Sequence, residues 1–186
     1  MTLNEIGSRA RAVSRDLNSL GSREKNMGLE EAARGLLEGE DEILAANEED
    51  CKRAEENGMS QGLLDRLKLT PARVQSMADG LLKVASLEDP VGEVISMKLR
   101  PNGLKIGQKR VPLGVIGMIY EARPNVTADA FGLCFKTGNA VILKGGSDAM
   151  ESNKAIVRWI RRGLIRAGLP EDAVQLIEDL SLIHIS

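Results

Sequence analysis

A short apolar run that leads directly into the start of a helix lies in residues 111–130, VPLGVIGMIYEARPNVTADA. Its apolar part, Val115 to Ile119, is bounded by Gly114 and by Arg123-Pro124, a pattern that favours a buried parallel strand over a helix. Asn125 stands where a helix N-cap is expected, and an apolar stripe follows it. The stretch therefore predicts a strand that feeds a helix, a junction at which functional residues of open parallel sheets gather.

Two further strands follow in the same order. Gly138-Asn139 is typical of a helix end, and Ala140 to Leu143 has the composition of a second buried strand. The turn KGGSD at residues 144–148 opens a helix expected from about Ala149 to Ala167, and residues 173–177 read as a third strand. The sequence thus predicts an α/β fold, in which residues 111–179 form three parallel strands joined by crossover helices.

Residues 1–90 are expected to form a helical layer in front of this sheet. Helices are expected near residues 3–20, 23–37 and 41–56, and Thr70-Pro71 is typical of the N-cap and first position of another helix. The acidic run Glu48-Glu49-Asp50 has two interpretations, a metal or partner site and a solvated helix face. Because it has helical spacing and no histidine nearby, we interpret it as a solvated face and predict no metal site.

The composition is that of a soluble cytoplasmic protein. Charged residues make up 28% of the chain, the net charge is −2, and no apolar stretch approaches the roughly 20 residues of a membrane span. The N-terminus lacks the basic and apolar regions of a signal peptide. The low net charge and an aromatic content of 2% argue against nucleic-acid binding. The two cysteines suggest reduced thiols rather than a disulfide framework.

The run at residues 111–130 and a second one at residues 136–147, KTGNAVILKGGS, resemble the aldehyde dehydrogenase superfamily and, within it, the gamma-glutamyl phosphate reductase family. The resemblance reaches to about Glu178 and covers less than half of a complete family member. It implies that residues 1–179 are the N-terminal part of a nucleotide-binding domain. The implied activity is NADPH-dependent reduction of L-glutamyl 5-phosphate to L-glutamate 5-semialdehyde, a step of proline biosynthesis.

Residues 94–110 are expected to form a β-hairpin, because polarity alternates on both sides of the turn Arg100-Pro101-Asn102-Gly103. In the superfamily, a projecting hairpin of this kind supports oligomerisation, which implies a homo-oligomer for the full-length protein. A plain surface ribbon is an equally good interpretation of the alternation alone.

The resemblance assigns roles to two residues behind the first strand. Asn125 falls on the asparagine that donates to the oxyanion in aldehyde dehydrogenases, where preorganised donors stabilise developing negative charge. From the residues alone, helix capping is the better interpretation of Asn125, and the resemblance reverses this preference. Relatives commonly have Pro-Trp-Asn where this chain has Arg123-Pro124-Asn125. Arg123 is therefore a candidate for binding substrate or phosphate.

The resemblance also identifies a cofactor segment at the end of the second strand. Lys144 matches the lysine that contacts the adenosine ribose, although alone it would be an ordinary exposed lysine. Gly145, Gly146 and Ser147 complete the turn, and Ser147 stands where most relatives have a glutamate that binds ribose hydroxyls. The implied cofactor is NADPH or NADP. No Gly-x-Gly-x-x-Gly fingerprint supports it, as the superfamily leads us to expect.

The resemblance implies a nucleophilic cysteine that neither thiol of the chain supplies. Cys51 lies in the acidic helix and Cys134 among apolar residues, so both are interpreted as structural and the chain is expected to be inactive. Residues 180–186, which include His184, are expected to be a non-native tail, with a terminal strand as the alternative. Two other functions remain open, namely another aldehyde dehydrogenase oxidoreductase and a noncatalytic nucleotide-binding module.

Overall fold

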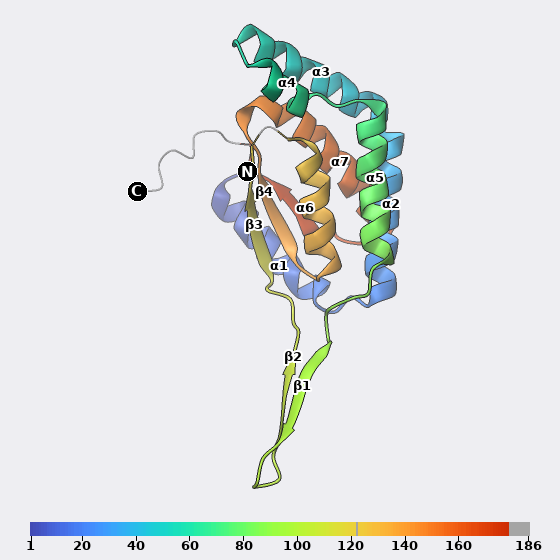
Figure 1. Cartoon of the computed structure of the whole chain (residues 1–186), viewed down its shortest axis with the longest axis vertical. Helices are drawn as coiled ribbons and strands as arrows, with labels where there is room; N and C mark the ends of the chain where they lie inside the picture. Colours follow the sequence, from blue (N-terminus) through green and yellow to red (C-terminus); the bar gives the residue numbers. More distant parts are fainter. Residues whose placement is uncertain (122, 179–186) are drawn as a thin grey trace, which may run out of the picture.

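The computed structural model describes residues 1–121 and 123–178. Helices come first, followed by a hairpin and then by a parallel sheet with its crossover helices (Figure 1). The helices are α1 (Leu3–Leu17), α2 (Ser22–Glu38), α3 (Glu40–Glu56), α4 (Gln61–Leu67), α5 (Pro71–Ser86), α6 (Asn125–Lys136) and α7 (Met150–Arg166), with the short 3-10 helices η1 (Ser147–Ala149) and η2 (Glu171–Ala173). The strands are β1 (Val94–Leu99), β2 (Lys105–Lys109), β3 (Val115–Ile119), β4 (Ala140–Lys144) and β5 (Val174–Leu176).

The parallel sheet has the order β3-β4-β5, so the α/β fold expected from the sequence is confirmed. Val115 pairs with Ala140 at one end of β3, and Ile119 pairs with Lys144 at the other. The central strand β4 is mostly buried, whereas Ile119 on β3 is 85% exposed. α6 packs on β4 and α7 on β5, while α1 contacts the sheet from its other side (Figure 1).

Within the helical layer, α2, α3 and α5 pack on α6 and α7, whereas α1 packs on the sheet. α2 lies between α5 and α7, and α3 crosses the start of α7 (Figure 1). Glycines allow α2 and α7 to approach closely: a Cβ on Gly163 would overlap the backbone of Glu31, and one on Gly35 would lie 2.5 Å from the carbonyl oxygen of Trp159. Within the described residues, no helix is both long and apolar enough to cross a membrane.

The β1-β2 hairpin projects away from the rest of the chain, as Figure 1 shows. Gly103 adopts a φ of +85° in its turn, a conformation that glycine tolerates and other residues rarely adopt. Apolar side chains such as Met97 and Leu99 on β1 are 61% and 69% exposed. The hairpin predicted over residues 94–110 is confirmed, and its role in oligomerisation stays a prediction.

The structure corrects two details of the sequence interpretation. Asn125 is the first residue of α6 rather than its N-cap, because Pro124 takes the cap position with φ −56° and ψ −33°. Asp50 is fully buried, whereas we interpreted the acidic run Glu48-Glu49-Asp50 as solvated; only its two glutamates are exposed. The short helix α4 was not expected at all. The predicted non-native tail, residues 180–186, lies outside the described residues.

Candidate functional site

The carboxyl ends of β3 and β4 bring two of the predicted segments together. The backbone N–H of Tyr120 donates to the carbonyl of Lys144 at 3.1 Å, one step beyond the last strand pair. The loops that follow the two strands therefore start side by side. Arg123 from the first loop and Gly146 and Ser147 from the second line one open cavity of about 300 Å³. Sequence-predicted residues that are separated along the chain thus share one surface, as expected at this edge of a parallel sheet.

The Gly145 turn is narrow because side chains fill the space beneath it. A Cβ on Gly145 would overlap the amide nitrogen of Asn153 and lie 3.3 Å from the ring of Tyr120. The hydroxyl of Thr127 donates to Asn153 Oδ1 at 2.8 Å and is itself 2.6 Å from the Tyr120 hydroxyl. Asn153 Nδ2 is buried and has no hydrogen-bond partner among the described residues. A side chain at position 145 would displace this buried polar group.

Lys144 and Ser147 flank this turn in different ways. Lys144 is half-buried, and its Nζ donates to the neighbouring Gly145 carbonyl at 3.1 Å. Ser147 is exposed and begins η1. The two side chains are therefore both accessible to a ligand, although only Ser147 lines the cavity that Arg123 shares.

Asn125 lies at the rim of an adjoining cavity of about 320 Å³. Arg123 lines this cavity too, so the predicted oxyanion donor and the predicted phosphate ligand face the same space. Asp129, one helical turn further along α6, is another lining residue. Burial raises the pKa of the Asp129 carboxyl, and a hydrogen bond from the side chain of Asn125 opposes this shift.

The N-terminus of α7 is already occupied by a carboxylate of the chain itself. Asp50 on α3 accepts hydrogen bonds from the N–H and the hydroxyl of Ser152, at 2.8 and 2.7 Å, and from the N–H of Glu151 at 3.3 Å. Helix N-termini often bind phosphate through such N–H groups. In this chain, the anionic groups of a ligand need other partners. One signal was present in the sequence, because Ile43, Asn47, Asp50 and Ala54 share the buried face of α3 at helical spacing.

Neither cysteine has the surroundings of a nucleophile. Burial raises the pKa of the Cys134 thiol, and burial together with the charge of Asp50 raises that of Cys51. A reactive thiol needs a lowered pKa and cationic neighbours. The described residues also contain no group of three or more side chains suited to holding a metal ion.

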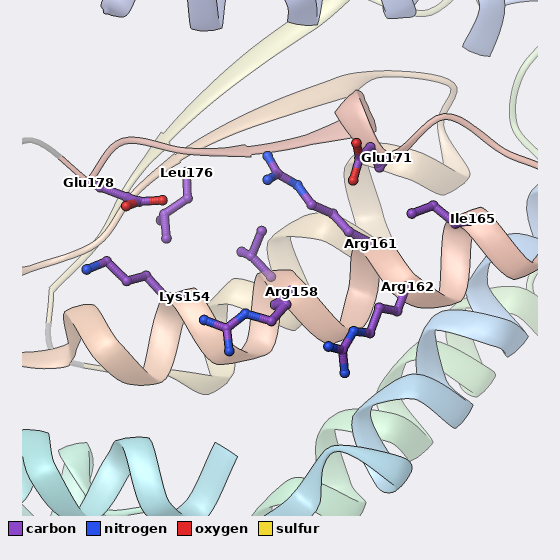
Figure 2. Close-up of a pocket in the computed structure, with 9 residues that line it drawn as sticks. Lys154, Arg158, Arg161, Arg162, Ile165, Glu171, Leu176 and Glu178 are labelled. Atoms are coloured by element: carbon purple, nitrogen blue, oxygen red, sulfur yellow. The ribbon is translucent and has the colours of Figure 1, made fainter. Parts of the chain in front are cut away.

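A further cavity of about 370 Å³ runs along α7, and its cations are largely engaged within the chain. Figure 2 shows four basic side chains of α7 with two glutamates close by: Lys154, Arg158, Arg161, Arg162, Glu171 and Glu178. Lys154 pairs with Glu151 at 2.9 Å, Arg158 pairs with Glu42, and Arg161 donates to the Val174 carbonyl. The guanidinium of Arg162 lies 4.3 Å from the centre of the Trp159 ring. This cavity is therefore a weaker candidate for a ligand-binding site than the two cavities at the edge of the sheet.

Curated proteins that resemble the chain are gamma-glutamyl phosphate reductases. The protein from Clostridium beijerinckii is 56% identical over 175 residues, which is 94% of this chain and 42% of the relative. The protein from Halothermothrix orenii is 57% identical over 91% of this chain and 41% of the relative. The chain thus spans about two fifths of the length of the curated relatives it matches. No protein-family model matches it.

Solved structures give the same result. The gamma-glutamyl phosphate reductase of Thermotoga maritima superposes with a TM-score of 0.92 at 44% identity, over 95% of this chain and 43% of that protein. The Saccharomyces cerevisiae reductase gives a TM-score of 0.89 at 32% identity, over 97% of this chain and 47% of that protein. An acetylating aldehyde dehydrogenase from Geobacillus thermoglucosidasius shares the fold, with a TM-score of 0.71 at 16% identity over 96% of this chain and 37% of that protein. In sequence and in fold, the chain thus matches the gamma-glutamyl phosphate reductases, which have an aldehyde dehydrogenase fold, over the part of their length that it spans.

Proposed function

We propose that the protein carrying this chain reduces L-glutamyl 5-phosphate to L-glutamate 5-semialdehyde with NADPH, in proline biosynthesis. The observation that carries the proposal is the meeting of Arg123, Asn125 and the Gly146-Ser147 turn at one edge of the sheet, in a chain that matches reductases of this name at 56% identity. We also propose a cytoplasmic location and a homo-oligomer, with no membrane or nucleic-acid partner.

Asn125 is proposed as the donor to the oxygen that gains negative charge at the reacting carbon. Its position at the start of α6, in the cavity that Arg123 also lines, suits this role, because a preorganised amide N–H stabilises negative charge that develops beside it. Arg123 is proposed to bind the phosphate that leaves, since a guanidinium matches phosphate geometry with two parallel hydrogen bonds.

Lys144, Gly145, Gly146 and Ser147 are proposed to hold the coenzyme. The shape of the turn depends on glycine, because a Cβ on Gly145 would collide with the buried side chain of Asn153, whose Nδ2 is unpartnered within the described residues. The coenzyme would supply the hydride. Lys144 offers an ammonium and Ser147 a small neutral hydroxyl beside the adenosine ribose. The nucleophilic thiol is proposed to lie outside the described residues.

The test is an assay of the full-length protein in the reverse direction. L-glutamate 5-semialdehyde, phosphate and NADP should give NADPH, detected by its fluorescence, only when all three are present. Turnover that needs no phosphate would instead indicate an aldehyde dehydrogenase that oxidises its substrate to the acid. Saturable NADPH binding without turnover would indicate a noncatalytic nucleotide-binding module.

A further inference from the structure

Five charged side chains line the cavity at the start of α6, which we name the arginine cavity. They are Asp65 and Arg66 on α4, Arg73 on α5, Arg123 in the loop after β3, and Asp129 on α6. Its volume of about 320 Å³ is suited to a small metabolite rather than to a dinucleotide. Helices α4 and α5 of the helical layer therefore contribute side chains to the site at the sheet edge.

One pair of these charges is compensated within the chain. Arg73 donates to the carbonyls of Asp65 and Lys68, and its guanidinium lies 3.5 Å from the Asp65 carboxylate. Arg66, Arg123 and Asp129 take part in no ion pair within the described ranges 1–121 and 123–178. Two guanidinium groups and one carboxylate are thus left to face a ligand.

These charges are the complement of an amino acid that carries an acyl phosphate. Such a molecule has two anionic groups, the α-carboxylate and the phosphate, and one cationic group, the α-ammonium. We propose that Arg66 binds the α-carboxylate and Asp129 the α-ammonium of the substrate, while Arg123 faces the phosphate. This assignment rests on the proposed function, and it names the residues that would restrict the enzyme to amino-acid substrates.

The spacing on α6 agrees with this assignment. Asp129 lies four residues, about 6 Å along the helix axis, beyond Asn125 on the same face of the helix. In an extended glutamyl group, four bonds separate the reacting carbon from the α-nitrogen, roughly 5 Å for bonds of ~1.5 Å. A substrate whose reacting carbon lies at Asn125 therefore brings its ammonium to Asp129.

The Asp129 carboxylate, which has no ion-pair partner among the described residues, also gains from a cationic ligand. Burial raises its pKa because no cation of the chain pairs with it among the described residues. An ammonium at hydrogen-bond distance would offset that desolvation cost and hold the carboxylate in its ionised form.

The experiment compares two aldehydes in the full-length protein, assayed in the reverse direction with phosphate and NADP. The first is L-glutamate 5-semialdehyde, and the second is 5-oxopentanoate, the same aldehyde without its amine. The wild type should prefer the first in kcat/KM. Asp129→Asn should reduce that preference by at least about tenfold, as expected for the loss of a hydrogen bond between charged groups. Arg66→Gln should lower kcat/KM for both aldehydes and keep the preference.

Two exposed substitutions serve as matched controls, Asp41→Asn on α3 and Arg100→Gln in the hairpin turn. Neither should change the preference or the KM for either aldehyde. Circular dichroism verifies folding, and Asp129→Ser repeats the test with a smaller side chain. An unchanged preference in both Asp129 variants, with an active wild type, would overturn this assignment alone. A wild type without phosphate-dependent turnover would overturn the proposed function and the assignment together.

Discussion

The carboxylate of Asp50 accepts two hydrogen bonds from Ser152, one from its backbone nitrogen at 2.8 Å and one from its hydroxyl at 2.7 Å, although the two residues are 102 positions apart. Asn47, one turn earlier on α3, adds a hydrogen bond to the same hydroxyl at 3.0 Å and another to the Leu67 carbonyl at 2.9 Å. This buried network ties the helical layer to the first turn of α7.

Asp50→Ala should destabilise the protein by about 2–3 kcal/mol, because it leaves the buried Ser152 hydroxyl and the N–H groups at the α7 N-terminus without their charged acceptor. Urea unfolding followed by circular dichroism measures the effect. The matched control is Glu49→Ala, which removes the adjacent exposed carboxylate and should stay within about 0.5 kcal/mol of the wild type. Equal midpoints for the two variants would refute this role of Asp50.

Asp50 should also make the free energy of unfolding decrease as the pH rises. Burial raises its pKa above the ordinary value of 3.8, against hydrogen bonds from Ser152 and Glu151 and the charge of Arg53. The folded state then holds the proton more tightly than the unfolded state. The contribution of Asp50 to the free energy of unfolding is fully present below pH 3.8. It is lost as the pH rises through the raised pKa that Asp50 has in the folded state. The free energy of unfolding, measured across this range, should fall with pH more for the wild type than for Asp50→Asn; parallel curves would contradict this.

Gly145→Ala should weaken coenzyme binding and lower the melting temperature. The added Cβ overlaps Asn153 Nδ2 and lies 3.3 Å from the Tyr120 ring, so the turn must shift. Combining it with Asn153→Ala removes the nearest obstacle and should restore part of the NADPH affinity. Gly117→Ala is the control, since a Cβ on Gly117 meets nothing within 4 Å. If the double variant binds NADPH no better than Gly145→Ala, the overlap is not the cause.

The sheet could be predicted from the sequence because each strand is a short apolar run between clear turn signals. Val115 to Ile119 and Ala140 to Leu143 carry their signal locally, and parallel pairing follows from the helices between them. α4 escaped prediction because seven residues give too little periodicity. Asp50 was misread because its partner, Ser152, comes from a distant segment that no local pattern reveals.

Some residues of the candidate site could be predicted from the sequence, and others could not. Arg123, Gly146 and Ser147 could be placed together in advance, because the carboxyl ends of neighbouring parallel strands meet at one edge. Arg66 and Asp129 could not. Arg66 reaches the site only through the packing of α4 on α3 and on Ala149 of η1. Asp129 has the appearance of an ordinary exposed residue in the first turns of a helix. Tertiary packing, rather than any motif, makes them candidates.

Neither thiol of the described chain should act as the nucleophile. Cys134 is buried, Cys51 is half-buried, and the pKa of each is raised. Cys51→Ser and Cys134→Ser in the full-length protein should therefore keep kcat within about tenfold of the wild type, whereas loss of a nucleophile costs many orders of magnitude. Reverse-direction turnover measures this. Abolished activity in either well-folded variant would assign the nucleophile to that cysteine.

The coenzyme preference should depend on Ser147. It is exposed in the cavity beside Gly146, where a glutamate would repel a 2′-phosphate and favour free ribose hydroxyls. Ser147→Glu in the full-length protein should shift the preference from NADPH toward NADH, with a loss on NADPH on the order of 1–3 kcal/mol, as for a charge-assisted hydrogen bond.

Lys144 should act on the same phosphate from the end of β4. Because its ammonium is held near the Gly145 carbonyl rather than paired with a carboxylate among the described residues, it is able to contact an anionic ligand. Lys144→Ala should therefore weaken the binding of NADPH more than that of NADH, since only NADPH carries the extra phosphate charge. The measurement is kcat/KM for both coenzymes in the wild type, Ser147→Glu and Lys144→Ala. An unchanged ratio of NADPH to NADH in Ser147→Glu would remove this turn from the choice of coenzyme, even with the proposed reaction intact.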